Sequence, residues 1–334
     1  MRTADFYYDL PDEAIAQKPV EPRDASRLLD ARDGTDHTFA SFPDLLESGD
    51  LMVLNRTRVR RARLRGRRSG TGGVVELLLL RPQGTGWEAL IRPARRMRPG
   101  VEVEVEGAVL RVAAGPSDGK VVMEAVTGSF DAAIEAGEIP LPPYICLPIS
   151  DPERYQTVFG DSVGSAAAPT AGLHITEAVL SRMAERGIRT AMIDLDVGLD
   201  TFRPISSERV EDHQIHTERF TVGHEVVAAI ESTRRGGGRV VAVGTTVVRS
   251  LETAAAARGR VVAMSGETSL YITPGYEFRV VDVMLTNFHV PGSTLLVLLA
   301  AFMGERWRGA YDIALERGYR FLSFGDAMLA ERSP

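Results

Sequence analysis

The spacing of the apolar residues changes between residues 58 and 126, and this change constrains the fold more than any other feature of the chain. Within this block, short runs of alternating apolar and polar residues replace helical spacing, and glycine or proline separates one run from the next. Several short strands at this spacing predict a small antiparallel β-barrel or sandwich. The runs cover residues 59–66, 74–80, 87–91, 101–105, 109–113 and 121–125.

Outside this block the sequence alternates between strand-like and helix-like segments. The continuous apolar run at 51–54 and the segment 239–243, which is apolar after Arg239, are typical of buried strands. The alternation predicts an α/β sheet with helices packed on it. We therefore expect a discontinuous α/β domain, residues 1–57 and 150–334, interrupted by an inserted all-β domain, a small barrel or sandwich, at residues 58–149. Further strands are expected at 28–29, 188–197, 269–272, 280–285 and 319–324, and helices at 42–47, 179–183, 226–230, 247–257 and 294–302.

The bulk properties are those of a cytoplasmic protein of 334 residues, long enough for two domains. No apolar run is long enough to predict a transmembrane helix, and the polar residues 1–10 do not have the character of a signal peptide. Cys146 is the single cysteine, so no internal disulfide can form, which fits a reducing compartment.

Arginine is concentrated at the entrance of the predicted barrel. Residues 56–98 hold thirteen arginines and two acidic residues, a net charge of +11 in a chain whose total is −6. The negative total argues against a protein coated with nucleic acid, but a local basic face can bind phosphates of any base sequence. A solvated strand face is the alternative, because alternate strand residues point outward in any case. The candidate RNA-binding residues are Arg58, Arg60, Arg95 and Arg96.

Residues 167–177 form a loop of small residues that ends in a histidine and a helix start. Thr176 is expected as the N-cap of that helix. Small residues let a ligand approach backbone N–H groups, and a helix N-terminus favours an anion. A tight turn in which His174 only packs is the alternative. The candidate site residues of this loop are Thr170, Gly172 and His174.

Two later loops also join a strand to a helix. Gly244, Thr245 and Thr246 place N–H and hydroxyl groups at the carboxyl end of a strand, where ligands often bind in α/β sheets. The loop lacks both G-x-G-x-x-G and the P-loop pattern, which excludes a dinucleotide or nucleoside-triphosphate site of those types. In the segment 286–294, Asn287 and His289 flank a phenylalanine, a combination suited to holding a flat base.

His213, His216 and Glu218 are spaced closely enough to act together. They have the chemistry of metal ligands, but the segment lacks H-E-x-x-H and no other cluster has metal spacing, so we expect no metal. Acid–base catalysis or hydrogen bonding to a substrate is the preferred interpretation. A structural pair of partly buried histidines is the alternative.

Several long motifs occur in one order along the chain. They read PTAGLH-I-T-E, VGL-x-TFRP, H-x-x-H-x-E, GTT-x-VR-x-LE, TPGY-x-F, TNFH-x-P-x-STLL and FGDAM, after an opening YDLP-x-x-x-IAQ-x-P, RD-x-SRLL and GDL-x-VLN-x-TRV. In these motifs the chain resembles, nearly end to end, the S-adenosylmethionine:tRNA ribosyltransferase-isomerase family of queuosine biosynthesis.

The resemblance implies an enzyme that transfers the ribosyl part of S-adenosylmethionine to 7-aminomethyl-7-deazaguanine in tRNA. The sugar is isomerised, giving epoxyqueuosine and releasing adenine and methionine. The family's fold is a discontinuous α/β domain with an inserted small antiparallel β-barrel domain, so the resemblance implies a barrel at residues 58–149. S-adenosylmethionine is consumed as a substrate, and no cofactor, metal or membrane is implied; we expect a monomer. We place His174, His213, His216 and His289 in the catalytic site, with Arg203 and Thr245 holding the carboxylate or ribose. Glu218, Gly244, Thr246 and Asn287 complete the expected substrate-binding set.

The sequence departs from the family pattern at four positions, Arg56, Arg61, Asp196 and Asp200. Asp196 and Asp200 flank the V-G-L motif, and two added carboxylates there would suit a changed acceptor. A divergent member that cleaves or rearranges S-adenosylmethionine with a small-molecule acceptor is therefore the alternative. An RNA-binding module without chemistry is a third hypothesis, disfavoured because the loops hold histidines instead of aromatic stacking platforms.

Overall fold

The computed structural model describes residues 1–117, 119–198 and 204–333, which form two compact units. One unit consists of Met1–Arg58, Pro142–Val163 and Ala168–Pro334, and the other of Val59–Leu141 with Gly164–Ala167. The sequence placed the inserted domain at residues 58–149. Two residues discussed above, Asp200 and Arg203, lie outside the described residues.

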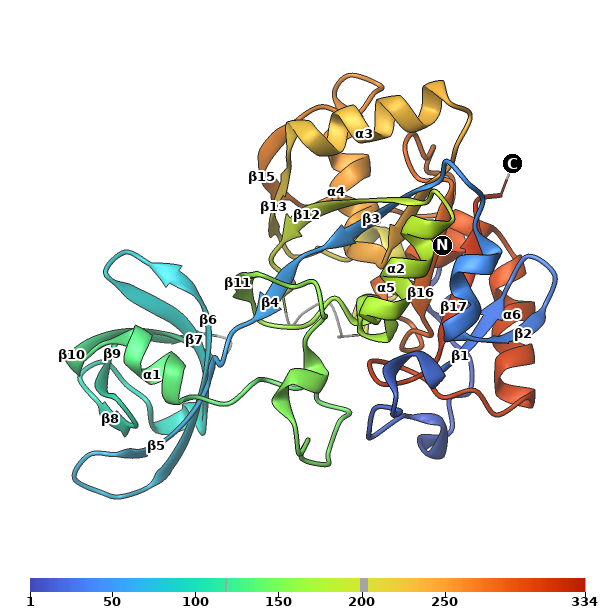
Figure 1. The fold of residues 1–334 in the computed structure, drawn as a ribbon. Coiled ribbons are helices and arrows are strands. Elements are labelled where there is room, and N and C mark those ends of the chain that lie inside the picture. Colours follow the sequence, from blue (N-terminus) through green and yellow to red (C-terminus); the bar gives the residue numbers. More distant parts are fainter. Residues whose placement is uncertain (118, 199–203, 334) are drawn as a thin grey trace. The chain divides into compact units, whose positions relative to one another are not determined.

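In the described part of the chain, the larger unit is built on a nine-stranded sheet in the order β15-β13-β12-β3-β14-β16-β17-β1-β2 (Figure 1). Its centre is parallel: β12, β3, β14 and β16 run in one direction, and β17 is antiparallel to β16. Every residue of β3, β14 and β16 is buried, as expected for strands covered on both faces. The strands are β1 (Arg27–Asp30), β2 (Thr35–Thr38), β3 (Leu51–Asn55), β12 (Arg189–Leu195), β13 (Glu218–Val222), β14 (Val240–Val243), β15 (Met264–Thr268), β16 (Val283–Asn287) and β17 (Ala327–Glu331).

Helices cover this sheet, and their ends follow sequence signals. Thr176 caps α2 through its hydroxyl, which accepts from the N–H of Val179, as expected from sequence. α5 is buried along nearly its whole length, whereas α2 and α3 each keep a polar face. The helices are α2 (Glu177–Glu185), α3 (His224–Arg235), α4 (Thr245–Ala256), α5 (Thr294–Met303) and α6 (Arg306–Glu316).

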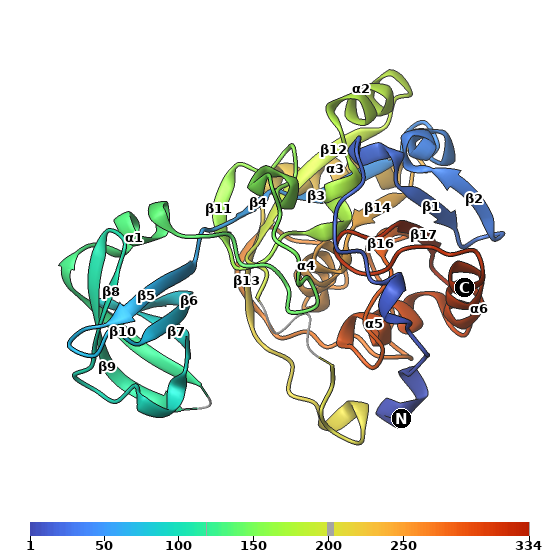
Figure 2. The ribbon, with the colours of Figure 1, turned by 90° about the horizontal axis from the view of Figure 1, so that it is seen from below.

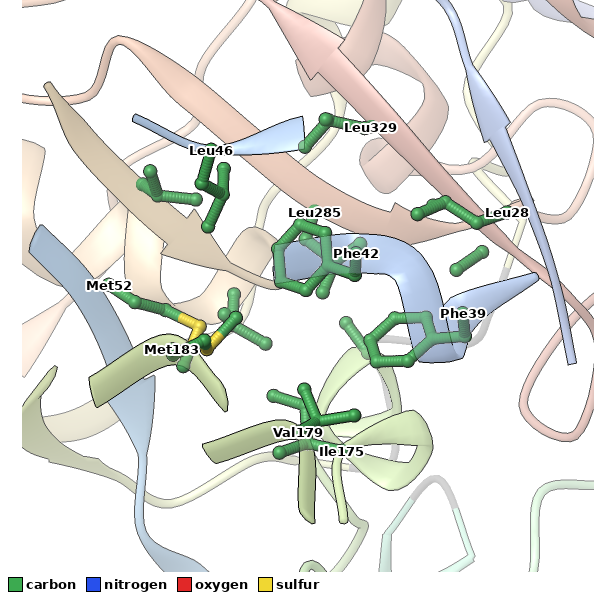
Figure 3. Packing of buried hydrophobic residues seen from close by; sticks show 14 of the residues in the cluster. Leu28, Phe39, Phe42, Leu46, Met52, Ile175, Val179, Met183, Leu285 and Leu329 are labelled. Atoms are coloured by element: carbon green, nitrogen blue, oxygen red, sulfur yellow. The ribbon is translucent and has the colours of Figure 1, made fainter. Parts of the chain in front are cut away.

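A hydrophobic core lies between the sheet, α2 and the 3-10 helix η4 (Phe39–Leu45). Phe39 and Phe42 from η4 pack with Val179 and Met183 from α2 against strand residues such as Met52 (Figure 3). In place of the expected α-helix at 42–47, the structure has the 3-10 helix η4, which begins three residues earlier and has Pro43 inside it.

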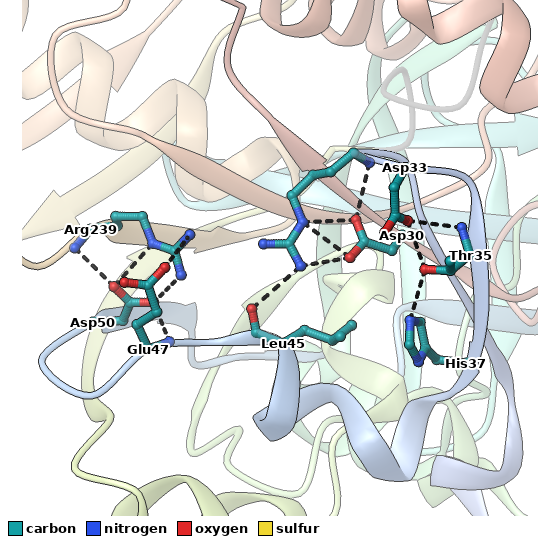
Figure 4. Close-up of polar contacts among 9 residues, drawn as sticks. Asp30, Asp33, Thr35, His37, Leu45, Glu47, Asp50 and Arg239 are labelled. Carbon is teal, nitrogen blue, oxygen red and sulfur yellow. Dashed lines mark hydrogen bonds and ion pairs between the residues drawn. The ribbon is translucent and has the colours of Figure 1, made fainter.

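Two buried carboxylates, Asp50 and Asp30, bind arginines in loops next to the strands of the sheet (Figure 4). Asp50 accepts hydrogen bonds from the backbone N–H of Arg239 at 3.0 Å and from its guanidinium at 2.7 Å, so it joins the starts of β3 and β14. Burial opposes ionisation of Asp50, but the bonds from Arg239 keep the pKa of this carboxyl below its usual value. Asp30 pairs in the same way with Arg32, at 2.6 Å.

Among its described residues, the smaller unit is a closed antiparallel barrel in the order β10-β7-β6-β5-β8-β9 (Figure 2). Leu64, Leu77, Ile91, Leu110 and Met123 fill its interior. The α-helix α1 (Phe130–Ala136), which the sequence analysis missed, begins at the cap Ser129. A separate two-stranded sheet pairs β4 (Thr57–Val59) with β11 (Ser162–Ser165). The barrel strands are β5 (Arg63–Arg68), β6 (Val74–Gln83), β7 (Gly86–Arg92), β8 (Glu102–Val105), β9 (Ala108–Ser117) and β10 (Lys120–Gly128).

The α/β class with a small antiparallel barrel is therefore confirmed, but two expected strands are wrong. Residues 269–272 are not a strand, and β15 lies just before them. Residues 319–324 form a turn in which Leu322 has a φ of 68°, and the last strand, β17, follows it. The apolar residues that indicated a strand are buried by ring packing instead, with Phe321 and Tyr319 both against Phe288.

Candidate active site

A cavity opens at the carboxyl ends of the parallel strands β14 and β16, with about 560 Å³ of empty space including its mouth. Three loops that the sequence analysis singled out meet there, although they lie far apart in the chain. Thr170 comes from the first loop, Gly244, Thr245 and Thr246 from the second, and Asn287 and His289 from the third. This edge of an α/β sheet is where ligands commonly bind.

The α4 N-terminus presents unused hydrogen-bond donors to the cavity. Gly244, the N-cap, has a φ of 90°, a conformation that residues with a side chain rarely adopt, and no side chain caps the helix. The carbonyl of Gly244 accepts from the N–H groups of Val247 and Val248, which begins the helical pattern. Thr246 is buried, and its hydroxyl has no partner among the described residues. The helix end therefore offers N–H groups and a hydroxyl to a ligand.

Asn287 lies at the end of β16 with its side-chain amide held in one orientation. Its Nδ2 faces three acceptors: the ring Nε2 of His174 at 3.1 Å and the carbonyl oxygens of Leu322 and Asp326 at 3.3 and 3.5 Å. Two carbonyls cannot donate, so the amide nitrogen must be the group that faces them. The Oδ1 atom is buried and has no partner among the described residues. Asn287 thus contributes an unused acceptor to the cavity wall.

His174 stands behind Asn287 and has both ring nitrogens occupied. Because Nε2 accepts from Asn287, the proton of the neutral ring lies on Nδ1, which donates to the hydroxyl of Ser26 at 2.7 Å. The ring also stacks on Phe39, with centroids 5.1 Å apart. Burial, reinforced by the charges of three nearby arginines, lowers the pKa of His174 to about 3. A neutral, fully bonded histidine is a poor proton carrier and a good positioning group.

His289 lines the cavity itself. Its Nε2 lies 2.9 Å from the hydroxyl of Thr286, and its backbone N–H donates to Tyr311 at 2.8 Å. Burial lowers the pKa of His289 to about 3, so this ring is also neutral near pH 7. A neutral imidazole can accept a proton or a hydrogen bond, but it cannot supply an acidic proton in the way an imidazolium does.

The second predicted histidine pair lies in the segment before β13, and Glu218 is the first residue of that strand. His216 contacts Glu218 at 3.1 Å, and the other oxygen of Glu218 pairs with Arg249. Glu218 also accepts from the N–H of Gly198, at 3.0 Å. Burial opposes ionisation of Glu218, but His216, Arg249 and Gly198 hold its pKa below the usual value. His213 packs edge-on to Tyr271, and burial lowers its pKa.

The structure therefore brings some of the predicted residues into the cavity lining, whereas His213, His216 and Glu218 are not part of that lining as described. Glu218 is bound by its own chain, and one of its partners, Gly198, directly follows the lining residue Val197. Gly172 serves packing: a Cβ there would lie 2.8 Å from the ring of Phe159. The sequence analysis missed Tyr144 and Ser323, which line the cavity and share a hydrogen bond of 2.7 Å. No local signal marks them, because only the tertiary fold brings them to this edge.

The predicted RNA-binding arginines also differ in their availability. Arg58 pairs with Glu153 at 2.7 Å, and Arg60 bonds the carbonyl of Gly164 and lies over the ring of Trp87, 4.8 Å from its centroid. Arg95 and Arg96 are exposed and have no acidic partner among the described residues. Arg92 and Arg98, in the same segment, are exposed and lack such a partner in that same part of the chain. The segment 92–98 is thus the accessible part of the basic barrel surface.

Within the described ranges, no group of three or more histidine, cysteine, aspartate or glutamate side chains is arranged to hold a metal ion. No helix in those ranges is long and apolar enough to cross a membrane.

Comparison with known proteins gives consistent matches along the whole chain. The family described as queuosine biosynthesis protein matches residues 3–330. A protein from Heliobacterium modesticaldum named S-adenosylmethionine:tRNA ribosyltransferase-isomerase is 51% identical, covering 98% of this chain and 99% of its own. A protein of the same name from Symbiobacterium thermophilum is 49% identical with the same coverage. The crystal structure of an S-adenosylmethionine tRNA ribosyltransferase from Thermotoga maritima is 35% identical, with a TM-score of 0.54 and coverage of 97% and 99%.

Proposed function

Because this chain belongs to the queuosine biosynthesis family, we propose that it acts as an S-adenosylmethionine:tRNA ribosyltransferase-isomerase. It transfers and isomerises the ribosyl moiety of S-adenosylmethionine onto 7-aminomethyl-7-deazaguanine in tRNA, giving epoxyqueuosine with release of adenine and methionine. This function is supported above all by one observation: three loops that contain family motifs meet in one cavity at the carboxyl ends of β14 and β16. S-adenosylmethionine is a consumed substrate in this reaction, and the chemistry requires no further cofactor.

The residues around the cavity support a division of roles. A sulfonium acidifies the neighbouring 5′ carbon of the ribose, so an unprotonated base can remove a proton there. We assign this step to His289, which lines the cavity; its lowered pKa leaves the ring unprotonated near pH 7 and makes it a weak base. We assign His174 to positioning, because both of its nitrogens are bonded to protein groups. Arg203, outside the described residues, stays a candidate for holding the carboxylate or ribose.

The tRNA contact is assigned to the barrel segment 92–98. Its exposed arginines, Arg92, Arg95, Arg96 and Arg98, are free to pair with phosphates. Arg58 and Arg60 are weaker candidates, since each is already engaged by its own chain. A tRNA substrate also supports the expected cytoplasmic location, and the assignment of the enzyme as a monomer is part of this proposal.

The small-molecule acceptor has no observation in its favour. Two of the four departures that motivated it have ordinary structural partners. Arg56, which directly follows β3, pairs at 3.0 Å with Asp194 of the neighbouring strand β12. Arg61 donates to the carbonyl of Glu135 at 3.0 Å within the barrel unit. Neither residue lines the cavity, so neither changes what the cavity binds.

The decisive experiment follows adenine and methionine by chromatography. The protein is incubated with S-adenosylmethionine alone, with tRNA carrying 7-aminomethyl-7-deazaguanine, and with the free base 7-aminomethyl-7-deazaguanine. We expect both products to form with the modified tRNA and epoxyqueuosine to appear in that tRNA. Product formation with the free base and not with tRNA would overturn the proposal.

A further inference from the structure

The cavity combines two kinds of unused polar group with an uncharged wall. The first kind is the donors of the α4 N-terminus together with the hydroxyl of Thr246, a residue 6% exposed whose hydroxyl lacks a partner among the described residues. The second kind is Oδ1 of Asn287, a residue 4% exposed, and this atom lacks a partner in the same part of the chain. Native proteins rarely leave buried polar atoms unpaired, so these atoms indicate where a ligand bonds. The described lining contains no charged side chain, and its histidine is neutral.

We propose that this cavity is the subsite for the adenine base of S-adenosylmethionine, in which Asn287 Oδ1 accepts from the exocyclic amine and the α4 N-terminus with Thr246 donates to a ring nitrogen. This inference rests on the proposed function and assigns one part of its substrate to one part of its site. Adenine has a donor amine beside an acceptor ring nitrogen on both of its hydrogen-bonding edges. The lining of the cavity offers the complementary pair, an acceptor on Asn287 and a donor on Thr246.

The methionine end of the substrate fits this cavity less well. A carboxylate and an ammonium group are costly to bury without charged partners. The cavity wall supplies apolar side chains such as Leu295 and Leu322 and the aromatic Phe288, which suit the faces of a flat neutral base. Because the described lining has no charged side chain, it suits the neutral base better than the methionine end, which carries both a carboxylate and an ammonium group.

The orientation of Asn287 gives the subsite its selectivity. Asparagine can present either its amide oxygen or its amide nitrogen to a ligand. If the amide were free to rotate by 180°, it could therefore bind either an amino-purine or an oxo-purine. The bonds of Nδ2 to His174, Leu322 and Asp326 prevent this turn. A purine with a carbonyl in place of the amine would then face Oδ1 with a second acceptor, an unfavourable contact.

The test measures binding of S-adenosylmethionine and of its deaminated analogue, in which hypoxanthine replaces adenine, by calorimetry on the full chain without tRNA. We expect the wild type to favour the amino-purine by at least about tenfold, since a site built around a substrate donor rejects an analogue that lacks it. Asn287→Ala should remove this preference. Thr246→Val should weaken binding of S-adenosylmethionine about three- to tenfold, and Thr246→Ser should restore it.

Thr286→Val is the matched control, because Thr286 lines the same cavity but its hydroxyl is already paired with His289. Its amino-purine preference should equal that of the wild type. Full preference in both Asn287→Ala and Thr246→Val would overturn the subsite. A decarboxylated analogue of S-adenosylmethionine gives a second check. If Thr246→Val did not weaken binding of this analogue, the helix end would hold the carboxylate of the substrate, and this result would also overturn the subsite. Adenine release by the wild type with modified tRNA, measured in parallel, tests the proposed function independently of these outcomes.

Discussion

Replacing His174 with glutamine tests whether this residue is held neutral by the fold. Glutamine has an amide donor and acceptor in place of the two ring nitrogens that bond Ser26 and Asn287, but it does not titrate. In the wild type, the pKa of His174 falls from an ordinary value of 6.5 to about 3 through burial and the charges of Arg320, Arg154 and Arg23. The native state therefore stays unprotonated at pH values where the unfolded chain binds a proton.

This difference makes stability depend on pH in a defined direction. The contribution of His174 is fully present above pH 6.5 and is lost progressively as the pH falls toward about 3. At pH 5.5, one unit below the ordinary value, protonation of this one group in the unfolded chain costs the native state about 1.4 kcal/mol relative to pH 7.5. The free energy of unfolding of H174Q should therefore fall less than that of the wild type, by about that amount.

The assay is urea unfolding followed by far-UV circular dichroism at pH 7.5 and 5.5. His289 titrates in the same direction in both proteins, so it cancels in the comparison. The control is His224→Gln, since His224 is exposed at the start of α3 and meets water in both folded and unfolded chains. Parallel losses of stability in the wild type and H174Q would refute the conclusion that the fold excludes the proton from His174.

Three further predictions follow from particular contacts. Asp50→Asn should lower the free energy of unfolding by about 2–3 kcal/mol in urea titrations, because it removes the charged partner of Arg239 at the starts of β3 and β14. Thr176→Ala should cost about 1 kcal/mol in the same assay through loss of the α2 cap, whereas Thr176→Ser should retain it. Replacing Arg95 and Arg96 together with glutamine should weaken tRNA binding and reduce its logarithmic salt slope by roughly 1.5, with a gel-shift titration as the readout. An unchanged slope in that variant would argue against the barrel segment as a phosphate contact.

The sequence predicted the elements whose periodicity is local and failed where tertiary packing decides. Strands β3 and β14 are buried on both faces, and each was predicted from a continuous apolar run. The barrel strands are buried on one face, and they were predicted from short runs of alternating apolar and polar residues. The segment 319–324 is equally apolar, yet it forms a turn, since its rings pack on Phe288 without a strand ladder. Periodicity reports that a residue is buried, and it does not report by which contact.

The candidate site follows the same division. Thr246 and Asn287 were predicted because each ends a strand or begins a helix at the sheet edge, a position that sequence can identify. For His174 the residue type predicted catalysis, whereas the positioning role that we propose rests on Ser26 and Asn287, partners from two distant segments that occupy both ring nitrogens. The charged neighbours that lower its pKa are also distant in sequence, so residue type alone indicated acid–base chemistry where the structure favours positioning.

The distinction between positioning and proton transfer has a kinetic consequence that decides it. If His174 only orients Asn287, H174Q should lower kcat for adenine release by a constant factor, about tenfold to a hundredfold, at every pH from 6 to 9. The logarithmic pH profiles of the two enzymes would then be parallel, because no titrating group of the reaction has been removed. A general acid or base would behave differently: its removal would flatten one limb of the profile as well as lower the rate. Loss of a limb in H174Q would return His174 to the catalytic role that the sequence indicated, whereas parallel profiles leave that role to His289 in the cavity wall.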